Sequence, residues 1–312
     1  MNPRTNRQDE VKRSSLPQRH TRRGGEDVWL GLFMALPIII LMGILVFWPL
    51  LMTFWDSVHR VDPMRFGTPF VGLHNYLSLF MDSDVQGAAF NTAVYVVVAV
   101  VIETTGGIAA ALLLNRLGRA RKWVLAAVIL PWALPPVVNS IIWLWIYNPS
   151  YGVLNGLLRM LGLIAQNHVW FNGRWTALLL IALVHIWRML PITAVIVLAG
   201  LQSIPQELYE AARIDGAGAI HRFRCITLPL IGGSLAIAMT QSTVLAFNLF
   251  DEAWILNGSS GDTRTLMIQV YMSAFQDLHF SYGMALSILV MFASLAVSLL
   301  YVVRGKAEIH AE

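Results

Sequence analysis

Six long runs of apolar residues constrain this chain more than any other feature. Each run is at least about 20 residues long and mostly apolar, which is the length needed to cross about 30 Å of hydrocarbon. The runs cover residues 28–54, 92–114, 123–147, 175–198, 229–250 and 282–303. Only 13% of the residues are charged, against about 25% in soluble domains. The pattern therefore predicts an all-α, polytopic membrane protein with six transmembrane helices.

The polar ends of the chain set the expected domain boundaries. Residues 1–27 are rich in Arg, Gln and Ser, and hold too little apolar surface to order themselves, so we expect a disordered tail. Residues 28–303 form the transmembrane domain, and residues 304–312 form a C-terminal tail. The first apolar run is too long for a signal peptide and no A-x-A-like site follows it, which predicts a retained anchor. The lone Cys225 excludes a disulfide framework and a Cys-based metal site.

Basic residues are distributed unequally between the two sides of the membrane. If the apolar runs alternate in direction, sixteen Lys and Arg lie on the side of the two termini and five lie on the other side. Because basic flanks are retained in the cytoplasm, both termini are predicted to be cytoplasmic. The net charge of +4 does not indicate nucleic-acid binding, since the positive charge flanks apolar runs instead of forming a basic face.

The loop between the fourth and fifth runs has the pattern of a helix-turn-helix. Ser203 and Gln206 have the spacing of a capping box, which predicts a short helix starting there. Gly216 and Gly218 then stop that helix and permit a turn, and a second short helix is expected over 219–226. The first helix would present a narrow apolar face that nothing else in the chain covers. This face consists of Leu208, Ala211, Ala212 and Ile214.

The same loop, residues 203–229, carries a long sequence pattern. The pattern is Glu210-Ala211-Ala212, three residues, Gly216, nine residues, then Ile226-Thr227-Leu228-Pro229. It resembles the EAA loop of binding-protein-dependent ABC importer permeases. In that family the loop supplies a coupling helix that docks in a cleft of the ATP-binding subunit. The resemblance implies ATPase-coupling roles for Glu210, Ala211, Ala212, Asp215 and Gly216.

Further segments are similar to the carbohydrate-type branch of this family, which includes maltose and glycerol-phosphate importers. They are Pro49 followed by Phe54-Trp55-Asp56-Ser57, the segments 70–76, 151–155 and 200–205, and Phe250-Asp251 followed by Asn257-Gly258. The resemblance implies the first of two paired permeases, a type I importer subunit that moves a sugar or sugar-like solute across the bacterial inner membrane. A cargo other than sugar stays open.

The resemblance also implies a set of partners. These are a second homologous permease, an ATPase dimer that binds ATP and Mg, an extracytoplasmic solute-binding protein, and membrane lipid. The chain contains no G-x-x-x-x-G-K-[ST] pattern, so ATP must be handled by another chain. No cofactor, metal site, nucleic-acid partner or enzymatic activity is expected of this chain itself.

Two ionisable residues fall inside the apolar runs, Glu103 and Arg188. Charges at this depth are expensive, so they either neutralise each other, meet a partner subunit, or face the solute path. His185 is interpreted as a packing residue, and Gly106-Gly107 as a site of close helix packing. In the carbohydrate branch, solute contacts come from this part of the fourth span and from the fifth. By that resemblance the candidates are Trp187, Arg188, Gln241, Ser242 and Asn248.

Two rival functions remain at this stage. An ion-coupled secondary transporter would need acidic relays within the spans, and only Glu103 fits that role. An intramembrane hydrolase or transferase would need paired catalytic groups at one depth, which the sequence does not provide.

Overall fold

The computed structural model describes residues 26–309, and the part of the chain it describes is helical without any β-strand ladder. One isolated bridge joins His59 and Phe70. Residues 1–25, which make up most of the expected N-terminal tail, and residues 310–312 lie outside the described part. The all-α prediction is confirmed.

Four helices are long and apolar enough to cross a membrane, and two more segments qualify as bent pairs. The first long helix joins α2 (Glu26–Met42), a π-helical turn η1 (Gly43–Phe47) and α3 (Trp48–Ser57). The other three are α5 (Ser83–Arg116), α10 (Arg174–Gln202) and α17 (Phe280–Ile309). The described residues thus contain up to six spans, if each bent pair counts as one.

The two bent pairs correspond to the third and fifth apolar runs, which sequence analysis treated as uninterrupted spans. In the first pair, the chain turns by 92° between Gly118–Ala133 and Pro136–Ile146. Leu134 is extended there (ψ 136°), because the proline that follows disfavours the helical conformation of the residue before it. In the second pair, the turn of 69° separates Ala219–Leu230 from Gly232–Phe247. The first pair contains η2 (Gly118–Ala120), α6 (Arg121–Val128), α7 (Leu130–Ala133) and α8 (Pro136–Ile146).

The second bent pair connects the predicted helix-turn-helix to the fifth span. After α11 (Gln206–Ile214), the chain passes through α12 (Ala219–Arg222), the π-helical turn η3 (Phe223–Thr227) and α13 (Leu228–Leu230). It then enters α14 (Gly232–Phe247). The predicted turn after the first short helix is confirmed. The second helix begins at Ala219 as predicted, but it becomes π-helical from Phe223 to Thr227 and continues through α13 to Leu230, beyond the predicted end at residue 226.

The segment up to Met52 forms a unit of its own. Within its apolar window no side chain is buried by the rest of the chain. Trp29, Phe33, Leu45 and Phe47 are among the exposed side chains. Such a helix is stable only where lipid or another protein covers it, which agrees with a transmembrane location.

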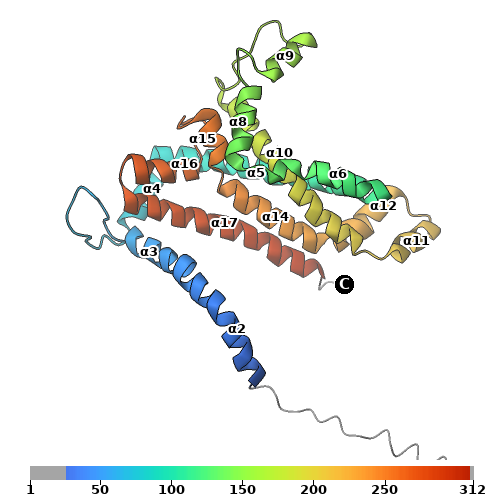
Figure 1. Cartoon of the computed structure of the whole chain (residues 1–312), viewed down its shortest axis with the longest axis horizontal. Helices are drawn as coiled ribbons and strands as arrows, with labels where there is room; N and C mark the ends of the chain where they lie inside the picture. Colours follow the sequence, from blue (N-terminus) through green and yellow to red (C-terminus); the bar gives the residue numbers. More distant parts are fainter. Residues whose placement is uncertain (1–25, 310–312) are drawn as a thin grey trace, which may run out of the picture. The chain divides into compact units, whose positions relative to one another are not determined.

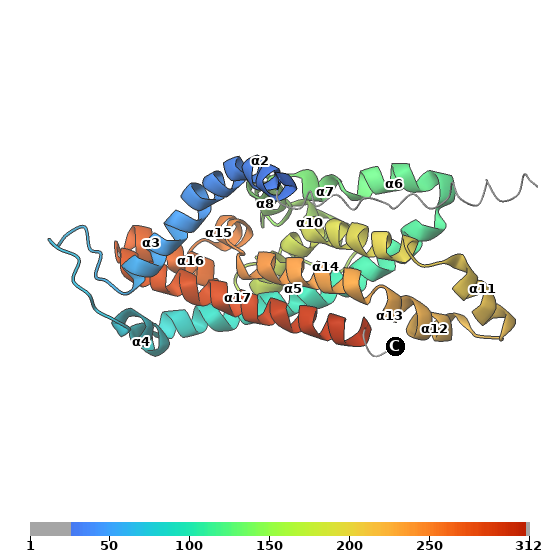
Figure 2. The ribbon, with the colours of Figure 1, turned by 90° about the horizontal axis from the view of Figure 1, so that it is seen from below.

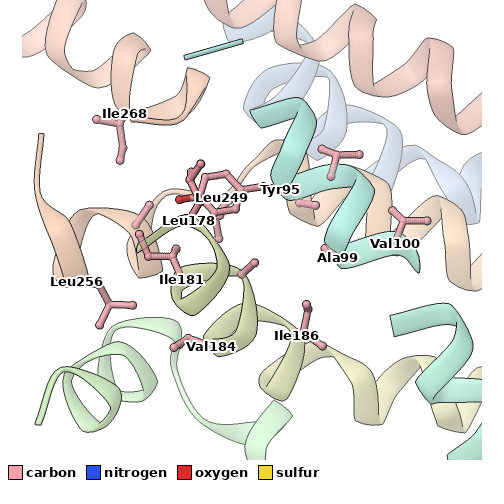
Figure 3. Close-up of a cluster of buried hydrophobic side chains, with 14 of the residues drawn as sticks. Tyr95, Ala99, Val100, Leu178, Ile181, Val184, Ile186, Leu249, Leu256 and Ile268 are labelled. Atoms are coloured by element: carbon pink, nitrogen blue, oxygen red, sulfur yellow. The ribbon is translucent and has the colours of Figure 1, made fainter. Parts of the chain in front are cut away.

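In the second unit, residues 53–312, α5, α10, α14 and α17 run beside one another (Figures 1 and 2). Gly106 and Gly107 allow α5 to approach α10 closely, as predicted. A Cβ atom on Gly107 would lie 2.6 Å from Thr193 Cγ2, closer than packing allows. Figure 3 shows the main apolar cluster, in which Tyr95 of α5 and Leu178 of α10 are fully buried.

Two groups of short helices in this unit lie at opposite ends of the bundle (Figures 1 and 2). One end holds α11 and α12, and the opposite end holds α4 (His74–Met81), α15 (Asp251–Asn257) and α16 (Leu266–Tyr271), which leads into η4 (Met272–Gln276). Between the third and fourth apolar runs lies the short helix α9 (Val153–Met160). The fold therefore supplies two distinct places for function, the bundle interior and the loop end.

Candidate functional sites: a buried polar cluster and an exposed loop

Five polar side chains from four helices meet inside the bundle, and we call them the polar cluster. Glu103 comes from α5, His185 and Arg188 from α10, Ser242 from α14 and Glu252 from α15. Arg188 donates hydrogen bonds from Nη2 and Nε to Glu252 Oε1, at 2.9 and 3.1 Å. Ser242 Oγ donates to Glu103 Oε2 at 2.6 Å. The cluster therefore links four helices through side-chain contacts alone.

His185 lies between the two carboxylates of this cluster. Its Nε2 atom is 3.6 Å from Glu103 Oε1, and its Nδ1 atom is 3.5 Å from Glu252 Oε1. Glu103 and Glu252 are buried, with 0% and 3% of their surface exposed. Two buried carboxylates therefore face one guanidinium and one imidazole inside the bundle.

The cluster bears on one alternative that the sequence left open and on the interpretation of His185. Arg188 pairs with Glu252 and makes no direct pair with Glu103 among the described residues. Glu252, which the sequence analysis did not single out, is buried in α15 just beyond the fifth apolar run. His185 is in contact with charge on both sides and is more than a packing residue. The sequence did contain a signal for this cluster. His185 and Arg188 are three residues apart and so share one helix face, and a cation inside the bundle on that face requires an acid as its partner.

The predicted solute-path residues have different surroundings. Trp187 is about half exposed and packs edge-on against Trp143 at 5.7 Å between ring centroids. Gln241 is partly buried, and Asn248 is exposed, with Nδ2 donating to Val244 O at 2.7 Å. Ser242 and Arg188 belong to the polar cluster. The five residues thus divide between two engaged in internal pairs and three at the boundary of the packed interior.

The exposed loop begins differently from the predicted capping box. Helix α11 starts at Gln206 with Pro205 at its N-cap and without a side-chain cap. Ser203 Oγ instead donates to Gly200 O, 2.8 Å away, at the end of α10. Only three residues separate α10 from α11, so the hydroxyl of Ser203 lies closer to the last turn of α10 than to the first turn of α11. Proline at the N-cap leaves Ser203 outside the position that a capping box requires.

Gly216 ends α11 in a left-handed conformation, with φ +77°. The amide of Ala217 donates to Ala212 O at 2.8 Å and that of Gly216 to Arg213 O at 3.1 Å, which closes the end of the helix. Only glycine adopts this φ without strain. The turn then places α12 and η3 against α11, where Tyr209 Oη and Thr227 Oγ1 are 3.0 Å apart.

The apolar face of α11 has no cover within the part of the chain that the structure describes. Leu208 and Ile214 expose 44% and 87% of their surface, and Ala211 is exposed as well. Glu210 points outward from the same short helix. A helix that displays apolar side chains outside the bundle, held rigidly at both ends, has the properties of a docking element for another protein.

The helical membrane fold and the projecting loop together define a polytopic transport subunit. The chain belongs to the family of binding-protein-dependent transport system inner membrane components, whose sequence profile matches residues 103–305. The chain is therefore a permease component of such a system.

Individual relatives align over nearly the whole chain. The trehalose/maltose transport system permease protein MalF of Thermococcus litoralis is 35% identical, over 89% of this chain and 94% of the relative. The sulfoquinovosyl glycerol transport system permease protein SmoG of Agrobacterium fabrum is 32% identical, over 88% and 90%. A chain in the crystal structure of a bacterial alginate ABC transporter, in complex with an alginate pentasaccharide-bound periplasmic protein, has the same fold. Its TM-score is 0.74 at 23% identity, over 88% of this chain and 93% of that one.

Metal ligands do not gather anywhere in the described residues. Within that part, no three His, Cys, Asp or Glu side chains lie close enough together to hold an ion. The Glu and His side chains of the polar cluster instead contact one another and Arg188. The chemistry of the cluster is charge pairing between helices.

Proposed function

We propose that this chain translocates a sugar or sugar-like solute as a permease subunit of an ATP-binding-cassette importer. The observation that supports the importer mechanism most directly is the exposed, apolar loop at 203–229, which has the position and shape of a coupling element. The sugar cargo is supported by the relatives above, since both are named for sugars or sugar derivatives and align along most of this chain.

The proposed assembly contains three kinds of partner. A dimer of ATPase subunits, which binds ATP and Mg, docks on the loop of this chain and on the equivalent loop of a second homologous permease. An extracytoplasmic solute-binding protein delivers the cargo. The exposed face of α11 supports the ATPase contact. The alginate transporter, determined together with a periplasmic protein, supports the delivery step.

The proposed location is the bacterial inner membrane, with both termini in the cytoplasm. The excess of basic residues on the side of the termini supports this orientation. The domain limits follow from it, with a cytoplasmic tail at 1–27, a transmembrane domain at 28–303 and a cytoplasmic tail at 304–312. The loop 203–229 then faces the compartment that contains ATP.

Coupling is assigned to the EAA segment of the loop. Gly216 fixes the turn, Ala211 and Ala212 allow close approach of the ATPase, and Glu210 and Asp215 offer charge at the edges of the contact. Because only three residues separate α11 from α10, a displacement of the loop reaches α10 directly. The polar cluster then transmits the movement from α10 to α5, α14 and α15 through the contacts of Arg188, His185 and Glu252.

The solute path is proposed to run along α10 and α14. Trp187 offers a ring face to a sugar, and Gln241 and Asn248 offer amides to its hydroxyl groups. Arg188 and Ser242 are proposed to act mainly by holding the cluster that shapes this path, since both are engaged inside the chain.

Reconstituted complexes test this function. The permease is assembled with its second permease and ATPase in liposomes, and ATP hydrolysis is measured with the cognate binding protein and a panel of sugars. We expect one sugar to stimulate hydrolysis and to enter the liposomes. Gly216→Pro and Glu210→Arg are expected to leave the complex inserted but to abolish the stimulation.

Two results would contradict the proposal. Hydrolysis that stays coupled to transport in both variants would remove the role of the loop. Solute uptake by this chain without any ATPase, driven by an ion gradient, would favour a secondary transporter. Stimulation by a solute that is not a sugar would keep the importer mechanism and change only the cargo.

A further inference from the structure

A cavity of about 530 Å³ lies between the exposed loop and the ends of two spans. Its volume is within the roughly 300–1,000 Å³ typical of small-molecule sites. The last turn of α5 contributes Leu112 and Arg116, and α10 contributes Leu201 near its end. The loop contributes Arg213 from α11 and Arg222 from α12. The cavity therefore spans the junction between membrane and loop.

No acid among the described residues forms an ion pair with the basic groups of this cavity. Its lining contains three arginines, Arg116, Arg213 and Arg222, and no carboxylate. Arg222 donates from Nη1 to Ala217 O, which fixes its position without neutralising it. Three like charges around one space repel each other, and an anion placed among them relieves that repulsion.

The lining is also divided between polar and apolar side chains. Leu112, Leu201 and Phe223 provide an apolar wall from the span ends and the start of η3. The arginines, with Gln206 and Tyr209, provide the polar groups on the loop. A ligand that matches both parts has an anionic head and an apolar body. Basic pockets beside the ends of transmembrane helices bind such amphiphiles through their phosphates.

We propose that this cavity binds the phosphate headgroup of an anionic phospholipid. In the orientation argued above, the lipid belongs to the cytoplasmic leaflet. Its phosphate lies among Arg116, Arg213 and Arg222, and one acyl chain follows Leu112 and Leu201. The lipid bridges α5 and α10 to the coupling loop, in addition to the packing of Tyr209 and Ile226 against the ends of these spans.

The alternative occupant is an acidic surface of the ATPase, and the geometry of α11 favours the lipid. Gln206, Tyr209 and Arg213 line the cavity and share one face of α11, at positions i, i+3 and i+7. Leu208 and Ala211 lie on the opposite face, where they are exposed. An ATPase docked on that apolar face contacts the side of α11 that points away from the cavity, and leaves the cavity free for a ligand from the membrane.

Lipid titration of the purified complex tests this site. The complex is stripped of endogenous lipid in detergent and titrated with phosphatidylglycerol or phosphatidylcholine, and bound lipid is counted by native mass spectrometry. The test variant is Arg116→Gln/Arg213→Gln/Arg222→Gln. The matched control, Arg119→Gln/Lys122→Gln/Arg224→Gln, removes the same charge from exposed neighbouring positions that do not line the cavity.

We expect the wild type and the control to bind one phosphatidylglycerol tightly. Neither should bind phosphatidylcholine with comparable affinity. The test variant should lose about a hundredfold in affinity for phosphatidylglycerol, since each cation near an anionic headgroup contributes about fivefold. Single Arg→Gln variants, each expected to lose about fivefold, keep the test informative if the triple variant does not fold.

Three results would overturn the proposal. Equal binding of the two lipids would exclude headgroup recognition. Displacement of phosphatidylglycerol by millimolar inorganic phosphate would show a site for the free anion instead of a lipid. Unchanged lipid binding together with lost ATPase association in the test variant would assign the arginines to the ATPase contact. None of these readouts depends on the sugar cargo, so the lipid site can fail while the importer function stands.

Discussion

The polar cluster and the exposed loop both depend on α10, but they differ in what completes them. The charged groups of the cluster contact one another within this chain, with Arg188 on Glu252 and His185 between two carboxylates. In the loop, by contrast, the apolar side chains Leu208 and Ile214 leave 44% and 87% of their surface exposed in the described part of the chain. The cluster pairs its charges within the chain, whereas the loop leaves an apolar surface for a partner.

This difference predicts that substitutions in the two regions will affect different properties of the protein. A change in the cluster leaves a buried charge without its partner, so it should lower the stability of the chain itself. A change on the exposed face of the loop removes no internal contact, so it should leave stability intact and affect assembly or coupling. The predictions below test this separation in order of the expected effect on the free energy of unfolding.

Removal of the acid that holds Arg188 should have the largest effect. Glu252→Ala leaves the largely buried guanidinium without its hydrogen-bonded carboxylate, which costs about 3–5 kcal/mol. We expect the variant to unfold at a much lower temperature in detergent and to accumulate poorly in the membrane. Thermal unfolding monitored by circular dichroism measures the effect.

Two further variants make this prediction specific. Asp251→Ala removes the neighbouring, partly exposed acid of the same helix, and should cost about 1 kcal/mol or less. Arg188→Met/Glu252→Met removes both charges, and should recover much of the loss because no unpaired charge remains. If Asp251→Ala destabilised as much as Glu252→Ala, the cluster would not be the source of the effect.

The hydroxyl of Ser242 should contribute the next largest amount. Ser242→Ala deletes the 2.6 Å hydrogen bond to Glu103 and leaves a buried carboxylate oxygen unsatisfied, at a cost of about 1–3 kcal/mol. Ser294→Ala is the matched control. Ser294 is also buried and bonds only to Met291 O of its own helix, so its loss should change stability little. Equal unfolding temperatures for the two variants would argue against the bond to Glu103.

The sequence predicted the loop better than the cluster, for a physical reason. The loop is built from local relations, such as the glycine stop after the apolar residues of α11, and local spacing is visible in one sequence. Arg188 and Glu252 are 64 positions apart, and their contact depends on how α15 folds back over the bundle. An acid near the end of a span gives no sign of whether it turns inward.

The course of the spans was also only partly predictable. Composition and length identified all six runs, because the bilayer imposes a minimum length on each. The bends of 92° and 69° were not predicted, although Pro135 and Pro136 marked the first of them. Hydropathy records the amount of apolar surface and not the direction of the backbone, so a broken span and a straight one have the same average.

The turn after α11 offers a comparison between two glycines of the loop. Gly216 has φ +77°, whereas Gly218 has φ −67°, and a Cβ atom on either would meet no other atom within 4 Å. Gly216→Ala should therefore cost about 1–2 kcal/mol of local backbone strain, and Gly218→Ala should be nearly neutral. We expect Gly216→Ala to lower the transport obtained per ATP hydrolysed while the unfolding temperature of the bundle falls only slightly.

Proteoliposome assays of uptake and hydrolysis measure this ratio for both variants. Equal ratios for the two alanine variants would mean that the left-handed turn does not set the position of the coupling helix. A large fall in the unfolding temperature of Gly216→Ala would mean that the loop is part of the folded core, against the comparison drawn above.

The smallest effect on stability is expected at the most exposed apolar residue of the loop. Ile214 exposes 87% of its surface, so Ile214→Ser should change the free energy of unfolding by no more than about 0.5 kcal/mol. The same change removes apolar surface from the face proposed to dock the ATPase, and should weaken the association of permease and ATPase. Ile220→Ser on α12 is the control, since Ile220 is also exposed but lies outside the apolar face of α11. Co-purification with the ATPase should fall for Ile214→Ser and stay near the wild-type level for Ile220→Ser, whereas equal losses in both would extend the contact across the whole loop.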